Sequence, residues 1–109
     1  MKDEIEKIAT DSVIFRLPQK PDVKGEIYVC QPFYSENDGL PRGWYCVRGL
    51  DGLIKPFPIL GMSSLQSLTL GVQSILLELN NFKKSGGTVL FENGKDEFYL
   101  CDDFQDLIG

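Results

Sequence analysis

The side chains most able to do chemistry in this sequence are carboxylates near its C-terminal end. Glu92, Asp96, Glu97, Asp102 and Asp103 lie close together, with Lys95 as the only base among them. Paired carboxylates can act as a general acid and base, but adjacent acids at a chain end more often cap a helix or face solvent. A concentrated negative surface also attracts a basic partner. We therefore interpret these five acids as a candidate partner-binding surface, against the simpler alternative of a solvated surface.

Most enzymatic chemistry lacks its usual residues in this chain. There is no histidine, which excludes Ser-His-Asp and Cys-His catalysis and histidine-ligated zinc. Neither glycine-rich phosphate-binding motif is present. Cys30, Cys46 and Cys101 have no CxxC spacing, and nothing in the sequence marks a base that would activate Cys46 or Cys101. We therefore expect no catalytic residue, no cofactor and no metal ion, and we interpret the cysteines as small buried apolar residues.

The net charge restricts the kind of partner. The formal charge is −5, whereas a nucleic-acid surface needs clustered Lys and Arg to replace counterions. This charge disfavours nucleic acid and permits a basic protein. No apolar run is long enough to span a membrane, and the charged start of the chain lacks the apolar centre of a signal peptide. We expect a cytoplasmic protein that does not act at a membrane.

One long helix over residues 63–82 is expected to organise the rest of the chain. Ser63 and Ser64 are good N-cap residues, and Ser85-Gly86-Gly87 supplies a stop signal. A core-facing stripe at helical spacing contains Leu65, Leu68, Val72, Ile75, Leu76, Leu79 and Phe82. Gly71 lowers helix propensity and indicates close approach of a strand or another helix.

The opposite side of this helix has two leucines but few charges. Leu70 and Leu77 lie off the core stripe, and Glu78 is the only charged residue between Ser63 and Phe82. A solvated helix face normally carries Lys, Arg and Glu. Either other parts of the chain cover these leucines, or a second copy contacts them in a homodimer.

Strands are expected before and after the helix. Alternation and β-forming residues predict extended segments over 12–17, 25–34, 43–50 and 53–60. Pro32 indicates a bulge or an edge position, and Pro56 and Pro58 make the fourth segment an edge strand or a lead-in to the helix. Asp51-Gly52 is a tight-turn pair.

A C-terminal β-hairpin follows the helix. A two-residue Asn93-Gly94 loop is expected to pair Leu90 with Glu97 and Val89 with Phe98. One buried face of this hairpin is expected to contain Val89, Phe91, Phe98 and Leu100. The order predicts a single α+β domain over residues 1–109. Its antiparallel sheet of about five or six strands carries the helix on one face.

Two stretches resemble an uncharacterised bacterial family of small single-domain proteins. The first is a tryptophan-containing strand ending in Gly-Leu, residues 43–50, and the second is a helix start that runs Gly-Met-Ser-Ser-Leu-Gln from Gly61. Ser63 stands where the family often has Asp, and either residue can cap a helix. The resemblance implies an α+β fold and no catalytic residue.

A looser similarity, in size, charge and class, is to immunity proteins of bacterial contact-dependent inhibition. It implies a non-catalytic protein that neutralises a cognate toxin by occluding it. Two alternatives remain open: a homo-oligomeric scaffold that uses the helix face with Leu70 and Leu77, and a small hydrolase.

The aromatic residues that flank the loop at 35–42, Trp44 and Tyr34 among them, form either a binding surface or part of the core.

Overall fold

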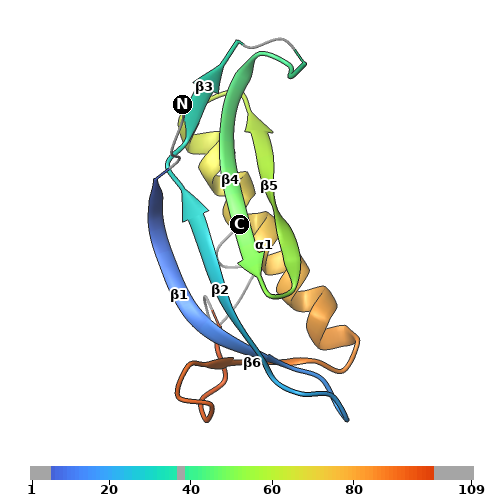
Figure 1. Ribbon diagram of the computed structural model, residues 1–109. Coiled ribbons are helices and arrows are strands. Elements are labelled where there is room, and N and C mark those ends of the chain that lie inside the picture. Colours follow the sequence, from blue (N-terminus) through green and yellow to red (C-terminus); the bar gives the residue numbers. More distant parts are fainter. Residues whose placement is uncertain (1–5, 37–38, 100–109) are drawn as a thin grey trace.

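The computed structural model describes residues 6–36 and 39–99 and confirms the α+β class, with six antiparallel strands and one helix (Figure 1). The elements are β1 (Lys7–Arg16), β2 (Val23–Cys30), β3 (Phe33–Ser35), β4 (Gly43–Asp51), β5 (Ile54–Gly61), α1 (Ser64–Lys84) and β6 (Thr88–Phe91). The first strand begins five residues before the predicted start, because residues 7–12 pair with β2 although their sequence does not alternate.

The pairing registers give the spatial order of the sheet. β4 pairs with β2 through its C-terminal half and with β3 through its first residues, while β5 lies along its other side. β1 lies between β2 and β6. β3 therefore continues the line of β2 after a break at Gln31 and Pro32. The predicted single strand over 25–34 is wrong, because Pro32 interrupts it where a bulge or an edge position was expected. The prediction that the segment with Pro56 and Pro58 forms an edge strand is confirmed, since β5 pairs with β4 alone.

Local signals set both ends of α1 close to the predicted positions. Ser63 is the N-cap: its side chain accepts a hydrogen bond from the Gln66 amide at 3.1 Å, and the Gln66 side chain accepts one from the Met62 amide. The helix continues two residues past Phe82. It ends where Gly86 adopts a left-handed conformation (φ 96°) and the Gly87 amide bonds back to Phe82.

The two halves of α1 approach the sheet at different distances. Ser67 and Gly71 are buried in the first half, and a Cβ at Gly71 would lie 3.0 Å from Cys46 Sγ. The expected close approach at Gly71 is therefore confirmed, and β4 is the strand that makes it. The predicted burial of Leu65 is wrong, because Ser67 and Gly71 face the sheet in this half and leave Leu65 75% exposed.

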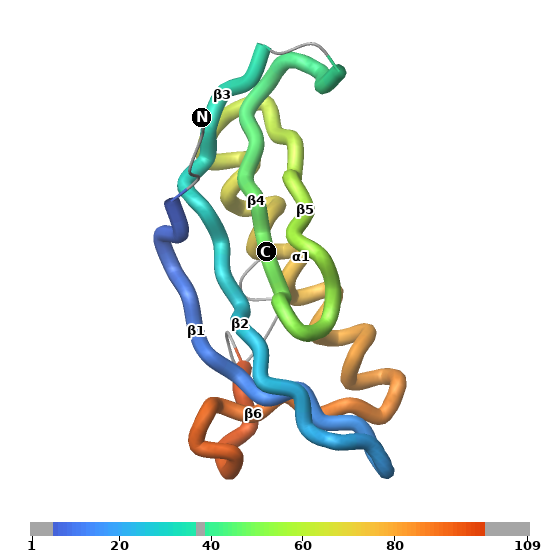
Figure 2. Tube along the Cα trace, in the orientation of Figure 1, coloured from blue at the N-terminus to red at the C-terminus, as the bar shows by residue number. Residues whose placement is uncertain are grey.

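The second half of α1 covers the main core. Its buried residues are Ile75, Leu79 and Phe82, and the Phe82 ring meets the Phe15 ring edge to face at 5.6 Å. From the sheet this core takes Val13, Phe15, Ile27, Val29, Cys46, Leu50 and Val89, and the segment after β6 adds Phe98. The alternation of the strands places the strand residues of this core on the face toward α1. No helix of the described chain lies over the other face of the sheet (Figures 1 and 2).

Arg48 is the one buried cation on the helix-covered face in the described part of the chain. Its guanidinium bonds to Ser74 Oγ at 2.9 Å and to the Lys55 carbonyl at 3.3 Å, and it lies 3.8 Å from the Glu78 carboxylate. These contacts tie β4, β5 and α1 together.

The hairpin has the predicted register and a different turn. Leu90 bridges Glu97, and the Phe98 amide donates to the Val89 carbonyl. The prediction of a two-residue loop is wrong, because the Phe91 amide donates a hydrogen bond to the Asp96 carbonyl and so leaves four residues in the loop. A type I′ turn needs positive φ at both central residues. Here Asn93 keeps a negative φ and uses its side chain as an acceptor instead.

Burial within the hairpin is also only partly as predicted. Val89 and Phe98 are buried, whereas Phe91 is 36% exposed at the end of β6 and touches Phe98 edge to face. Leu100, predicted on the same face, lies outside the described residues.

Candidate functional site

The structure separates the three described acids of the predicted partner-binding surface. Glu97 Oε2 lies 3.4 Å from Lys83 Nζ at the end of α1. The Asp96 carboxylate accepts a hydrogen bond from the Asn93 amide group at 2.9 Å. Glu92 instead lines a hollow on the uncovered face of the sheet. Asp102 and Asp103 lie outside the described residues.

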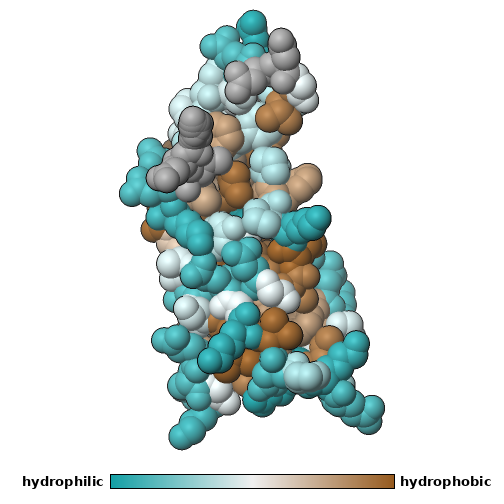
Figure 3. Space-filling model, viewed as in Figure 1, coloured by the Kyte–Doolittle hydropathy of each residue, from teal (hydrophilic) through white to brown (hydrophobic). Residues whose placement is uncertain are grey.

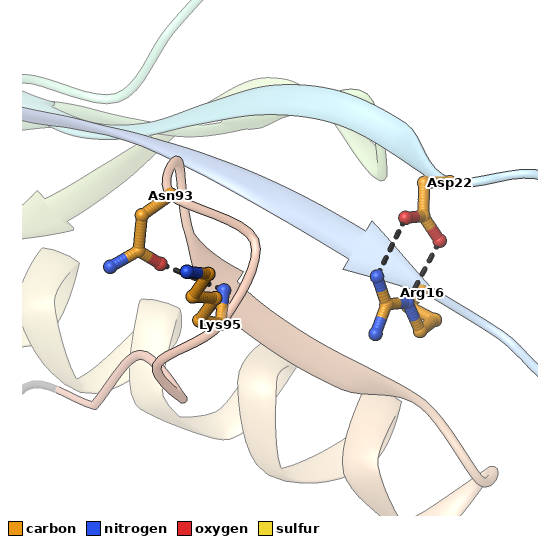
Figure 4. A network of polar contacts seen from close by, with 4 residues as sticks. All are labelled: Arg16, Asp22, Asn93 and Lys95. Carbon is orange, nitrogen blue, oxygen red and sulfur yellow. Dashed lines mark hydrogen bonds and ion pairs between the residues drawn. The ribbon is translucent and has the colours of Figure 1, made fainter.

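The loop that carries Glu92 is held by its own polar contacts. Asn93 Oδ1 accepts hydrogen bonds from the backbone amides of Lys95 at 2.8 Å and Asp96 at 3.1 Å, and Figure 4 shows the contact with Lys95. The same view shows Arg16 in a two-bond ion pair with Asp22, at 2.9 and 2.8 Å, at the far end of β1. Glu92 therefore projects from an ordered turn.

The hollow beside Glu92 has a volume of about 320 Å³. Its wall is formed by Ser12, Val13 and Ile14 of β1, Lys24, Gly25 and Glu26 of β2, Asp51 of β4, and Glu92. Glu26 and Asp51 are direct cross-strand partners in the pairing of β2 with β4. Like charges in that arrangement repel. With three acids and one base, Lys24, among its lining residues, the hollow has a net negative charge.

One of these acids already has a basic partner. Lys7 Nζ lies 2.6 Å from Glu26 Oε1 and 4.1 Å from the centre of the Tyr28 ring. This hydrogen bond raises the pKa of Lys7. Asp51 and Glu92 make no ion pair with another residue in 6–36 or 39–99. They are therefore the two carboxylates of the hollow that remain available to a partner.

The negative charge of the chain is unevenly distributed. Residues 6–36 and 39–99 contain ten acidic and ten basic side chains, so the net charge of −5 comes entirely from the remaining segments. Three aspartates of this excess are in residues 100–109. The excess negative charge of the chain therefore lies in these segments, while the described residues contribute a local acidic hollow.

Figure 3 shows the uncovered face of the sheet, with hydrophilic side chains on the β1 and β2 side and an apolar strip toward β4 and β5. Leu60, which lies opposite Tyr45 in the pairing of β4 with β5, is 43% exposed on this face. Tyr45 is buried on the same face, where its ring stacks on Phe33 and its hydroxyl donates to the Pro41 carbonyl at 2.7 Å.

The aromatic residues near the 35–42 loop divide between the two interpretations. Tyr45 belongs to the packed interior, whereas Tyr34 is 49% exposed and meets Trp44 edge to face at 5.7 Å. Among these aromatic residues, Tyr34 is therefore the one classed as exposed, while Phe33 and Trp44 are half-buried.

Cys46 is poorly placed to be a nucleophile. It is fully buried beneath α1, its thiol donates a hydrogen bond to the Cys30 carbonyl, and burial raises its pKa. Burial raises the pKa of Cys30 in the same way. Cys101 lies outside the described residues. Within 6–36 and 39–99, no group of three or more His, Cys, Asp or Glu side chains is arranged to hold a metal ion.

The two helix leucines predicted to contact a second copy differ in exposure. Leu77 is 55% exposed, whereas Leu70 is half-buried.

No helix in the described part of the chain is long and apolar enough to cross a membrane.

Sequence reasoning missed Glu26 and Asp51 as members of the site. Asp51 was assigned to a turn, and Glu26 lies far from Glu92 in the chain. The alternation along β2 indicates that Glu26 and Tyr28 share one face of the sheet, and this is the only signal in the sequence for Glu26. The register of β2 with β4, which places Glu26 opposite Asp51, cannot be read from that alternation.

Comparison of the chain with models of known families, with curated proteins and with solved structures gave no match.

Proposed function

We propose that this protein is a non-catalytic binding protein of the immunity type, which neutralises a basic toxin in the cytoplasm by covering its active surface. The observation that carries the proposal is the acidic hollow on the uncovered face. There Glu26 and Asp51 oppose each other and Glu92 joins them from the hairpin.

The charges of the hollow suit a basic partner. A Lys or Arg side chain entering it reduces the repulsion between Glu26 and Asp51 and neutralises Asp51 and Glu92. The aspartates outside the described residues add long-range attraction, which increases the association rate at low salt. Asp96 and Glu97 of the predicted surface contribute less, because Asn93 and Lys83 already contact them.

The first experiment is a growth assay. The C-terminal domain of the protein encoded by the neighbouring upstream reading frame is expressed with and without this chain. Arrest of growth that this chain relieves is the expected result. Absence of toxicity, or toxicity that this chain does not relieve, contradicts the proposal.

The second experiment tests the surface once the partner is in hand. The double variant Asp51→Lys/Glu92→Lys is expected to weaken binding at least about a hundredfold and to reduce its salt dependence, since close charge pairs across an interface are worth several kcal/mol. Glu36→Lys is the matched control, because Glu36 is an exposed acid at the other end of the molecule. Equal affinity and salt dependence in wild type and double variant would remove the hollow from the proposal.

A homo-oligomeric scaffold is the second candidate, and the exposure of Leu77 favours it. Light scattering at high protein concentration tests it, and a strictly monomeric species contradicts it.

A further inference from the structure

A cationic side chain of the chain itself already binds one wall residue of the acidic hollow. Lys7 Nζ donates a hydrogen bond to Glu26 Oε1 at 2.6 Å and lies 4.1 Å from the centre of the Tyr28 ring. A carboxylate beside an aromatic face is a favourable environment for an ammonium group. The position of Lys7 therefore shows directly which class of group this part of the surface binds.

The strand register explains how Lys7 reaches Glu26. The backbone of Lys7 pairs with Cys30, whereas Glu26 lies four residues earlier in β2. The lysine side chain therefore runs along β2 and crosses the Tyr28 ring before it meets the carboxylate.

The aromatic ring under this lysine is held by the sheet. Tyr28 is buried and lies opposite Gly49 in the pairing of β2 with β4. A Cβ at Gly49 would collide with the tyrosine ring, so the glycine is what leaves room for the ring against β4. The contact surface for a cation is therefore built from two strands.

The ion pair itself is accessible to solvent. The side chains of Lys7 and Glu26 are 42% and 37% exposed. Ion pairs at this exposure contribute little to stability, and the stem of a lysine is flexible. The hydrogen bond with Glu26 is the main cause of the raised pKa of Lys7, and the charge of Asp51 adds to it. A competing cation that contacts these carboxylates can therefore displace Lys7 at small cost.

We propose that Lys7 is an internal competitor for the acidic hollow, which a Lys or Arg side chain of a basic partner displaces from Glu26 when it binds. The inference rests on the proposed function, since the hollow must bind a basic partner, and it adds how that site is regulated. With Lys7 in place, Asp51 and Glu92 are the available carboxylates. Its displacement adds Glu26 and the Tyr28 ring to the surface that receives the partner. Lys7 therefore reduces the affinity of the hollow for any cation that has to use Glu26.

The test uses a hexa-arginine peptide as the basic probe, so that it does not depend on the identity of a toxin. The lysines are labelled by reductive ¹³C-methylation, which keeps their charge, and the peptide is titrated at low salt. The Tyr28 ring is expected to shift the methyl resonance of Lys7 in the free protein. As the peptide binds, this resonance should move to the position of an exposed lysine such as Lys84. Its loss in Lys7→Met gives the assignment.

Two variants measure the competition itself. Lys7→Met keeps an apolar stem beside Tyr28 and removes the charge, so it is expected to tighten peptide binding about two- to fivefold. Lys84→Met is the matched control, because it makes the same change in net charge on α1, on the other side of the sheet, and should change the affinity much less. The gain from Lys7→Met should vanish in a Glu26→Gln background, where the carboxylate that Lys7 blocks is gone.

Several results would overturn the proposal. One is an absence of peptide binding, and another is binding that leaves the Lys7 resonance in place. A gain that is equally large in Lys84→Met, or that persists with Glu26→Gln, would show that net charge alone acts. Relief of toxicity in the growth assay without displacement of Lys7 removes this inference alone. Displacement by the peptide without relief of toxicity leaves it standing and contradicts the toxin-neutralising role.

Discussion

The two faces of the sheet carry different kinds of side chain. The face under α1 is apolar, with Arg48 as its single buried cation among the described residues. The small residues Ser67 and Gly71 of α1 let the helix approach the sheet closely, at Gly61 of β5 and at Cys46 of β4. The uncovered face places Glu26 opposite Asp51 beside the hollow that Glu92 joins. The first arrangement stabilises the fold, whereas the second adds local repulsion that a partner can relieve. Changes on the two faces should therefore separate stability from binding.

The largest loss of stability is expected for Phe82→Ala, on the helix-covered face. Phe82 packs on Phe15 and lies against Gly87, so its removal leaves a cavity between α1 and the sheet. The free energy of unfolding should fall by about 3–5 kcal/mol. Urea denaturation measures it, with the exposed Leu77→Ala as a control that should cost much less. A similar loss in both variants would contradict the stated location of the core.

A smaller loss is expected where the layers are closest. Gly71→Val inserts methyl groups against Cys46 Sγ, and overpacking of this kind costs about 1–3 kcal/mol. Gly71→Ala adds only the Cβ and gains helix propensity, so it should cost less. A double-mutant cycle with Cys46→Ala should recover part of the loss in Gly71→Val. No coupling between the two positions would show that the contact with Cys46 is not what limits the approach.

The buried thiols predict a loss of stability in alkaline solution. Burial raises the pKa of Cys30 and Cys46 above the value of 9.0 expected in the unfolded chain. The folded state therefore keeps its protons while the unfolded state releases them. The contribution of these thiols to the free energy of unfolding is fully present below pH 9. It is lost as the pH rises above 9, by at most about 1.4 kcal/mol per pH unit for each thiol. Urea denaturation between pH 8 and 10 tests this, and Cys46→Ala should reduce the slope. An equal slope in both proteins would be inconsistent with a buried Cys46.

The smallest effect on stability is expected on the uncovered face. Asp51→Asn removes the carboxylate opposite Glu26 and should change the free energy of unfolding by less than about 0.5 kcal/mol. Burial is the main cause of the raised pKa of Tyr28, and Asp51 adds to it, so the variant should lower that pKa. Ultraviolet titration of the tyrosines measures the change. A large loss of stability would mean that Asp51 has a structural role.

Local patterns predicted much of the fold. Serine at position 63, the glycines after Lys84 and the apolar spacing between them located α1 to within two residues. Pro56 and Pro58 predicted the edge position of β5, and Pro32 marked the irregular point at which the structure divides the expected strand into β2 and β3. Each of these signals acts through neighbouring backbone geometry, which is why one stretch of sequence is enough to detect it.

The candidate site was only partly predictable. Glu92 was identified from the concentration of acids, but the same reasoning grouped it with Asp96 and Glu97, which contact Asn93 and Lys83 instead. Leu65 has the spacing of the core stripe and is nevertheless exposed, because spacing along the helix does not determine how much of the helix surface the sheet covers.

The sequence by itself determined the helix, the approximate positions of most strands, the register of the hairpin and the absence of histidine chemistry, since these depend on residue type and short-range spacing. Only the tertiary structure decided that Glu26 lies opposite Asp51, that Arg48 pairs with Glu78, and that β6 pairs only with the last four residues of β1. Those features depend on which strands become neighbours. That choice is made by the packing of the whole core, and no single segment encodes it.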